Sequence, residues 1–234
     1  MEQQGTKRIV RQGAAAAWPI CLGYVPIGLA FGVLAQKAGL TPFDIALMSV
    51  LVFAGSAQFI GVYMLQAGAG PLPIIATTFM VNLRHVLMSS SLARYMPGIP
   101  KRWLSLYAYG VTDESFAVNL VRFQEGGWGF FPALAANHVA NLTWIAATVA
   151  GGYMGELIPP GAFGIDYALA AMFIGLLVFQ LKDRQHWLAA LVAGGLAALL
   201  ARHAPYNLHV MAGCVAGATA GFAAKRSARG GEEA

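Results

Sequence analysis

An arginine lies near the middle of an apolar run that is long enough to cross a membrane. The segment 72–95 carries Arg84, with Asn82 and His85 beside it. A spanning helix needs about 20 largely apolar residues. Charged groups inside such a helix almost always face the interior of a bundle or a water-filled cavity. The sequence therefore predicts that this helix is central in a helical bundle. The alternative is a structural arginine that joins helices through backbone carbonyls.

The composition assigns the whole chain to one membrane domain. Of its 234 residues, 58% are hydrophobic and 11% are charged, whereas a soluble domain carries about 25% charged residues. No polar stretch is long enough for a separate domain, so residues 1–234 are predicted to form a single transmembrane domain. Basic tails at 1–12 and 225–234 contribute much of the net charge of +5. In a membrane protein this charge indicates contact with the lipid bilayer and not with nucleic acid.

Eight apolar segments are predicted to span the membrane, each close to the length that a bilayer requires. They are 14–36, 44–66, 72–95, 103–122, 130–154, 164–181, 186–202 and 206–224. The first is too long for the apolar core of a cleaved signal peptide, so it is expected to be retained. We expect an all-α integral membrane protein, a polytopic bundle of about eight helices, with seven as the alternative.

The lysines and arginines of short connections indicate the orientation, because cytoplasmic loops carry an excess of them. Both tails are basic, which predicts that the N- and C-termini are cytoplasmic. The cluster Arg94, Lys101 and Arg102 violates this pattern. Either a middle segment re-enters the membrane without crossing it, or the cluster faces an aqueous vestibule.

Small residues at every fourth position predict close helix packing, because they let two backbones approach. This spacing occurs at Gly28 and Gly32, at Gly151 and Gly155, and in the last predicted span. Packing within the chain and packing against a second subunit fit the pattern equally well.

Two predicted spans contain features that can interrupt a helix. Pro26, followed by Gly28, is expected to kink or break the first span, because proline lacks a backbone donor. In the second span, Gly55 lies in a run of small residues, and Ser56 and Gln58 supply hydrogen-bonding groups. Carbonyls freed at such places can face a cation. Packing kinks and hydrogen bonds between helices are the alternatives.

The segment 103–122 is the most polar of the predicted spans. Gly110 is followed by Thr112, Asp113 and Glu114, which is typical of one helix ending and another beginning with a capped, acidic first turn. Two half-helices that meet inside the membrane build substrate sites in secondary transporters. Asp113 or Glu114 can pair with Arg84 or carry a proton. The alternative is an ordinary loop with an acidic cap, which leaves fewer spans.

Two further helices carry polar stripes. Asn82 and His85 share one face of segment 72–95, and Arg84 lies on a second face about 100° away. Asn137 and Asn141 are one turn apart on segment 130–154. Such amides suit either a polar pathway or hydrogen bonds between helices.

These features favour a transporter over an enzyme or a channel. The sequence has no common catalytic, nucleotide-binding or metal-binding motif, so we expect no cofactor and no enzymatic activity. Nor does it contain a segment like a channel filter. Discontinuous helices with a cation and two acids fit a secondary transporter whose substrate carries a carboxylate and an ammonium group. A transporter of another small metabolite and a membrane-embedded enzyme remain the alternatives.

Four motifs resemble the AzlC family, the large subunits of branched-chain amino acid permeases. The motifs are Pro26-Ile27-Gly28-Leu29-Ala30-Phe31-Gly32, Phe53-Ala54-Gly55-Ser56-Ala57-Gln58-Phe59, Asn82-Leu83-Arg84-His85 and Thr112-Asp113-Glu114-Ser115-Phe116-Ala117. The resemblance implies export of branched-chain amino acids such as valine across the bacterial cytoplasmic (inner) membrane. It also implies a small hydrophobic partner subunit of the AzlD type.

A working mechanism combines these expectations. Arg84 and nearby helix N-termini are expected to receive the substrate carboxylate, and carbonyls at residues 23–28 and at Gly55 and Ser56 to receive the ammonium. Asp113, Glu114 and His85 suggest proton coupling. A hydrophobic pocket distinguishes one methylene by only about 1–3 kcal/mol, so broad specificity that includes methionine is expected.

Overall fold

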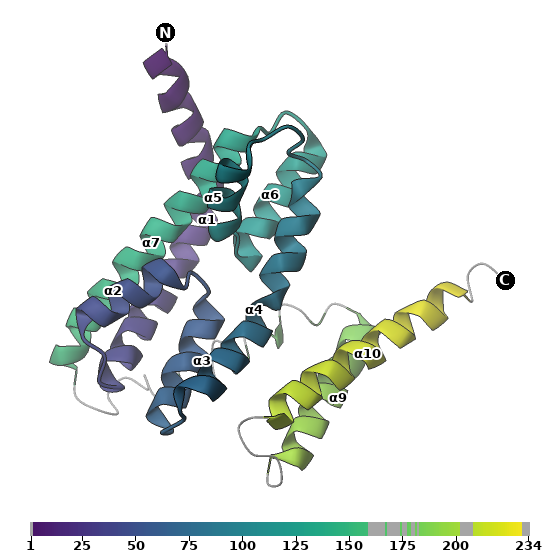
Figure 1. The fold of residues 1–234 in the computed structure, drawn as a ribbon. Helices are drawn as coiled ribbons and strands as arrows, with labels where there is room; N and C mark the ends of the chain where they lie inside the picture. Colours follow the sequence, from purple (N-terminus) through teal and green to yellow (C-terminus); the bar gives the residue numbers. More distant parts are fainter. Residues whose placement is uncertain are drawn as a thin grey trace. The chain divides into compact units, whose positions relative to one another are not determined.

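The computed structural model describes residues 2–158, 167, 174, 177–178, 181, 183–201 and 208–230. In these residues the regular structure is helical and no β-strand occurs (Figure 1). The helices are α1 (Glu2–Lys37), α2 (Pro42–Leu51), α3 (Gly55–Gln66), α4 (Pro71–Ala93), α5 (Lys101–Tyr109), α6 (Asp113–Glu125), α7 (Phe130–Leu157), α9 (Arg184–Leu200) and α10 (Leu208–Gly230). The all-helical prediction is confirmed for this part of the chain. The predicted span 164–181 lies largely outside the described residues.

The chain divides into two compact units. The first comprises Met1–Ala67 and Val81–Ala168, and the second Gly68–Met80 and Leu169–Ala234. All the polar positions singled out above lie in the first unit. In the second unit, α9 and α10 pack closely, because a Cβ atom added at Gly217 of α10 would lie 2.6 Å from the Ala189 carbonyl oxygen of α9.

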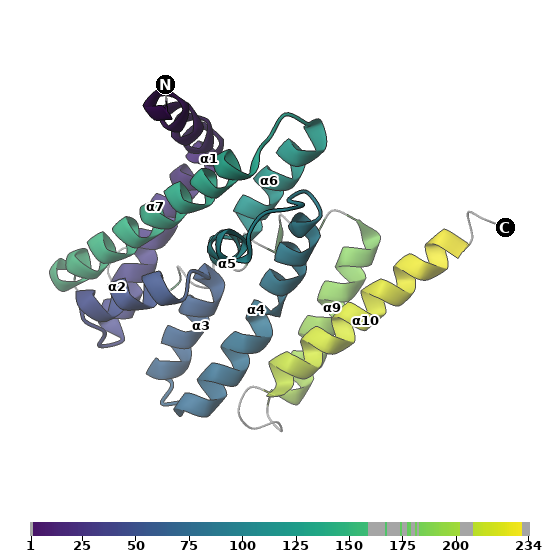
Figure 2. The same ribbon diagram turned by 45° about the horizontal axis from the view of Figure 1, so that its top comes forward.

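The long helices α1 and α7 lie side by side in the first unit, as Figures 1 and 2 both show. Glycines allow this contact. A Cβ atom at Gly32 would lie 2.0 Å from the carbonyl oxygen of Thr148, and one at Gly151 would lie 2.2 Å from that of Leu29. Real side chains never approach this closely, so the two backbones touch where only glycine fits. The predicted close packing therefore occurs within the chain.

Helix α1 runs without interruption through Pro19 and Pro26. The predicted break near Pro26 and Gly28 is therefore wrong. A proline removes one intrahelical hydrogen bond, but α7 supports the helix immediately beyond this point, because Gly28 packs against Ala147. Tertiary packing thus outweighs the local cost of the proline.

The predicted spans 44–66 and 103–122 are each divided into two helices. The first is interrupted at residues 52–54, between α2 and α3, and the second at residues 110–112, between α5 and α6. These are the discontinuities expected near Gly55 and Gly110. A helix rises 1.5 Å per residue, and even α6, the longest of the four with 13 residues, is about 20 Å long. No single half can cross a hydrocarbon core about 30 Å thick.

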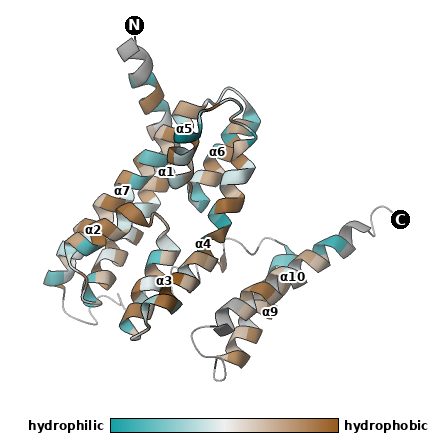
Figure 3. Ribbon diagram, in the orientation of Figure 1, coloured by the Kyte–Doolittle hydropathy of each residue, from teal (hydrophilic) through white to brown (hydrophobic). Residues whose placement is uncertain are grey.

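The helices of the first unit carry many hydrophobic residues (Figure 3). Large hydrophobic side chains are exposed on several helices, among them Phe43, Tyr63, Leu87, Leu142 and Leu157. Within the described residues, Lys7–Lys37 and Pro71–Ala93 are long and apolar enough to cross a membrane. Exposed apolar side chains on several helices fit a protein surrounded by lipid rather than by water.

The contact between α1 and α7 predicts that Gly32→Ala lowers the stability of the protein. The added methyl group must separate the two backbones, and overpacking of this kind costs about 1–3 kcal/mol. We expect a lower Tm for the purified protein in detergent. Gly23→Ala on the same helix is the matched control, because an added Cβ there meets no atom within 4 Å. Equal melting temperatures for the two variants would contradict the close contact.

Candidate functional site

The polar centre of the first unit is built around Arg84 on α4. Its Nη1 atom lies 2.7 Å from Oδ2 of Asp113, the first residue of α6. Its Nη2 atom donates a hydrogen bond to Oγ of Ser56, in the first turn of α3. The side chains of Arg84 and Asp113 are 33% and 45% exposed, so the ion pair is neither sealed in a core nor free in solvent. One of the two pairings that the sequence allowed, Arg84 with Asp113, is present.

Two helix N-termini meet at this arginine. The N-cap of α3 is Ala54, whose side chain makes no capping hydrogen bond, and the first intrahelical donor is Gln58, whose N–H lies 2.9 Å from the Ala54 carbonyl oxygen. The N–H groups of the first turn of α3 therefore have no intrahelical acceptor. These groups carry partial positive charge. Together with the guanidinium, they favour an anionic group at this position.

The start of α6 is fixed by a capping box. Thr112 Oγ1 accepts the backbone N–H of Ser115 at 3.3 Å, and Ser115 Oγ accepts that of Thr112 at 2.8 Å. Both residues are buried. The predicted cap at Thr112 is confirmed, and its rigidity holds the Asp113 carboxylate beside Arg84.

Tyr24 of α1 is a member of the site that the sequence analysis missed. Its hydroxyl donates to Oε2 of Glu114 at 2.8 Å and lies 2.8 Å from Oγ1 of Thr112. The ring is buried and packs edge-on against Trp144, with 5.2 Å between the ring centroids. The available signal was a phenol within an apolar span, which needs a hydrogen-bond partner when buried. Glu114 is thus held by α1, away from the Arg84–Asp113 pair.

Gln58 belongs to a separate buried network. Its Nε2 atom donates to Ser49 Oγ at 3.1 Å, and its Oε1 atom accepts from Trp144 Nε1 at 2.8 Å. Ser49 also lies 2.9 Å from Thr148 Oγ1. Both ends of the Gln58 amide are engaged, and the network ties α2 and α3 to α7. This placement agrees with the alternative that Gln58 joins helices.

Asn137 and Asn141 support the interrupted helices. Asn137 Nδ2 donates to the carbonyl oxygen of Tyr107, at the end of α5, at 3.2 Å, and its Oδ1 accepts from Asn119 at 2.8 Å. Asn141 donates to the Tyr109 hydroxyl at 3.3 Å. These amides satisfy polar groups at the α5–α6 break, where a Cβ atom at Gly110 would lie only 2.8 Å from that of Asn137.

The remaining predicted residues are placed differently. Among the described residues, Asn82 Oδ1 and Arg84 Nε are buried without a hydrogen-bond partner. His85 is partly buried, Pro26 is exposed on α1, and Gly28 packs against α7. Buried polar atoms are nearly always satisfied by protein or water, so the two orphaned atoms on α4 mark a place for water or a ligand. In this part of the chain no group of three or more metal-ligating side chains occurs.

Comparison with known proteins identifies the family. A family model described as AzlC protein matches residues 19–158, which include every residue of the site described above. The chain belongs to the AzlC family. It is 30% identical to the branched-chain amino acid transport protein AzlC of Bacillus subtilis over 176 residues, covering 73% of this chain and 68% of that protein.

Two other relatives are named as membrane proteins. The inner membrane protein YgaZ of Escherichia coli is 30% identical over 215 residues, covering 88% of this chain and 86% of that protein. An uncharacterized membrane protein of Archaeoglobus fulgidus is 30% identical over 202 residues, covering 85% and 87%. No solved structure matches the chain. The family and these relatives assign the chain a membrane function related to transport.

The amide contacts at the second break predict that Asn137→Leu destabilises the protein. The change removes the donor to the Tyr107 carbonyl and leaves the Nδ2 group of Asn119 without its acceptor, and each buried unsatisfied group costs about 1–3 kcal/mol. We expect a clear fall in Tm. Leu142→Ala, an exposed position on the same helix, should change Tm little. If Asn137→Leu melts like the wild type, the amide does not support the break.

Proposed function

We propose that the protein is a secondary transporter that exports branched-chain amino acids and is coupled to protons. The observation that carries the proposal is the Arg84–Asp113 ion pair where the first turns of α3 and α6 meet. The pair supplies a cation for the carboxylate of a zwitterionic substrate and an anion for its ammonium group, close to each other. The name of the Bacillus subtilis relative, a branched-chain amino acid transport protein, supports this substrate class.

In the proposed mechanism the substrate inserts between the two charged residues. Its carboxylate binds the guanidinium of Arg84, whose fork geometry suits a carboxylate, and the free N–H groups of α3. Its ammonium group binds the carboxylate of Asp113. This assignment replaces the carbonyls of residues 23–28, because α1 is unbroken there. Substrate binding exchanges one ion pair for two, so little charge is left unpaired during the step.

The side chain of the substrate is expected to meet apolar walls near the two breaks. Phe53 lies in the first break, and its ring centroid is 6.4 Å from that of Tyr109 at the end of α5. Apolar contacts of this kind discriminate weakly between aliphatic side chains. The proposal therefore includes valine-like substrates and methionine.

The proposal also includes the setting of the transporter. We infer seven or eight membrane spans with both termini in the cytoplasm, a location in the bacterial inner membrane, and a small hydrophobic AzlD-type subunit as partner. The halves α2, α3, α5 and α6 would then pair or re-enter, because each is too short to cross alone.

Arg84→Gln should abolish transport, since the variant lacks the group that receives the substrate carboxylate. A lost hydrogen bond to a charged group costs about 1.5–3 kcal/mol, and we expect at least a tenfold fall in counterflow. Counterflow of a panel of amino acids into proteoliposomes, with and without the partner subunit, measures this effect. Arg94→Gln, just beyond the end of α4, is the matched control and should remain active.

The double variant Arg84→Gln/Asp113→Asn separates function from folding. It removes both charges together, so neither remains unpaired within the bundle. We expect normal insertion and a smaller fall in Tm than in either single variant, but no counterflow. Wild-type counterflow in this variant would exclude the ion pair as the substrate site.

Glu114 is the acid that we assign to proton coupling. Asp113 is paired with Arg84, whereas Glu114 is exposed, accepts a hydrogen bond from the Tyr24 hydroxyl and forms no salt bridge within the described residues. Glu114→Gln should therefore retain counterflow, which needs no net driving force, but lose the response to an imposed pH gradient. Wild-type transport that is indifferent to the gradient would exclude proton coupling, and a response retained by the variant would exclude Glu114.

A further inference from the structure

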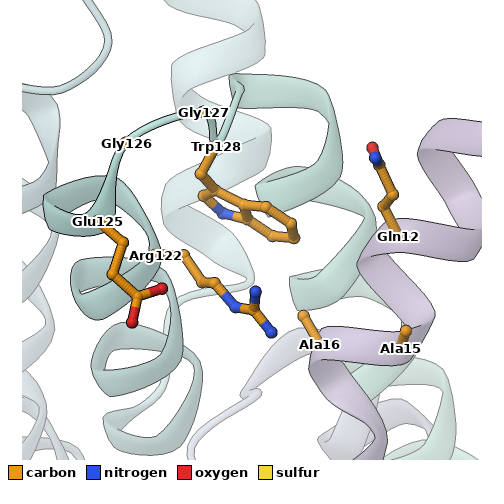
Figure 4. A pocket seen from close by; sticks show the side chains of 8 residues that line it. All are labelled: Gln12, Ala15, Ala16, Arg122, Glu125, Gly126, Gly127 and Trp128. Carbon is orange, nitrogen blue, oxygen red and sulfur yellow. The ribbon is translucent and has the colours of Figure 1, made fainter.

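A second polar site lies at the far end of α6 from the ion pair. A pocket of about 320 Å³ opens between residues 12–16 of α1, the end of α6 and the loop that leads into α7 (Figure 4). Gln12, Ala15 and Ala16 line it from α1, and Arg122, Glu125 and Trp128 from the other side. Among the described residues, none of these side chains forms a hydrogen bond or salt bridge with Arg84, Asp113 or Glu114, so the pocket is separate from the proposed substrate site.

In the described residues the cation of this pocket, Arg122, contacts a tryptophan ring and forms no salt bridge, although Glu125 also lines the pocket. The guanidinium carbon of Arg122 lies 5.7 Å from the centre of the Trp128 ring, and the indole is itself held by a 3.0 Å hydrogen bond to Asn119. Figure 4 shows the guanidinium pointing toward Ala16, whereas the Glu125 carboxylate points elsewhere. Among the described residues no carboxylate lies within 4 Å of Arg122. The contact with the Trp128 ring leaves the N–H donors in the plane of the Arg122 guanidinium available, and their fork-shaped arrangement matches a phosphate.

The pocket lies where a lipid headgroup would be. Gln12 immediately precedes the predicted span 14–36, Arg122 ends the span 103–122, and Trp128 precedes the span 130–154. Three separate segments therefore place the pocket at one membrane–water interface, where tryptophan is enriched. The basic tail puts this interface on the cytoplasmic side, whose lipids attract clustered Lys and Arg.

The surface of α1 continues the pocket in both directions. Arg8 lies one turn before Gln12 and Arg11 directly precedes it, and all three side chains are exposed. Ala15, Trp18 and Leu22 follow at helical spacing on the same face and are also exposed. The face is thus basic on the N-terminal side of the pocket and apolar on its C-terminal side, which matches a headgroup joined to acyl chains.

We propose that this pocket binds the headgroup of an anionic phospholipid. The phosphodiester binds the guanidinium of Arg122, and the Gln12 amide contacts the polar part of the headgroup. An acyl chain lies along Ala15, Trp18 and Leu22. A zwitterionic phosphatidylcholine binds less well, because the basic residues of α1 favour a net negative headgroup.

The test uses the purified full-length protein in detergent, titrated with phosphatidylglycerol or phosphatidylcholine and observed by native mass spectrometry. We expect phosphatidylglycerol to bind preferentially and Arg122→Gln to bind it about tenfold more weakly, as expected for the loss of one charge-assisted contact. Arg226→Gln makes the same change of charge at another exposed site and should bind like the wild type. Equal binding of the two lipids, or equal losses in the two variants, would overturn the proposal.

Two further arms identify the ligand. Ala15→Trp fills the pocket without changing any charge and should also block phosphatidylglycerol; binding that survives this change places the lipid elsewhere. Soluble glycerol phosphate should not displace the lipid at millimolar concentration, since it lacks the acyl chains. Displacement would assign the pocket to a soluble phosphate compound instead.

Discussion

The ion pair between Arg84 and Asp113 is the interaction on which the arrangement of the first unit depends. An isolated guanidinium within a membrane is costly, and pairing with a carboxylate offsets that cost only if the carboxylate is held in place. The capping box at Thr112 provides this restraint. The break between α5 and α6 thus places Asp113 in a capped first turn beside the arginine of α4.

Each break creates polar backbone groups that must be satisfied where water is scarce. At the end of α5 the carbonyl of Tyr107 is satisfied by Asn137, and at the end of α2 the carbonyl of Val50 accepts the Tyr109 hydroxyl at 2.6 Å. Much of the polar content that a transmembrane sequence displays is consequently structural. The amides of α7 stabilise the breaks through neutral hydrogen bonds, whereas Arg84, Asp113 and Glu114 are the charged groups of the site.

The local sequence correctly predicted the break between α5 and α6, but it also predicted a break in α1 that does not occur. Gly110 favours the end of one helix, and Thr112 and Asp113 favour the start of the next. The division between α5 and α6 could therefore be predicted from neighbouring residues alone. Pro26 carries an equally strong local signal, yet α1 continues, because the residues of α7 that pack against it, Ala147 and Gly151 among them, lie far away in the sequence. The same limit explains Tyr24 and Gln58. The residue type shows that each needs partners, but only the fold shows that Tyr24 meets Glu114 and that Gln58 meets Trp144.

The two breaks are also joined to each other. Tyr109 at the end of α5 donates to Val50 at the end of α2, while Arg84 contacts the first turns of both α3 and α6. The C-terminal ends are thus linked by a neutral hydrogen bond and the N-terminal ends by a charged bridge. A ligand that displaces Asp113 from Arg84 loosens only the second link, because the first involves neither residue. The first turns of α3 and α6 are therefore the parts of the breaks whose separation substrate binding would change, while α2 and α5 remain tied to one another.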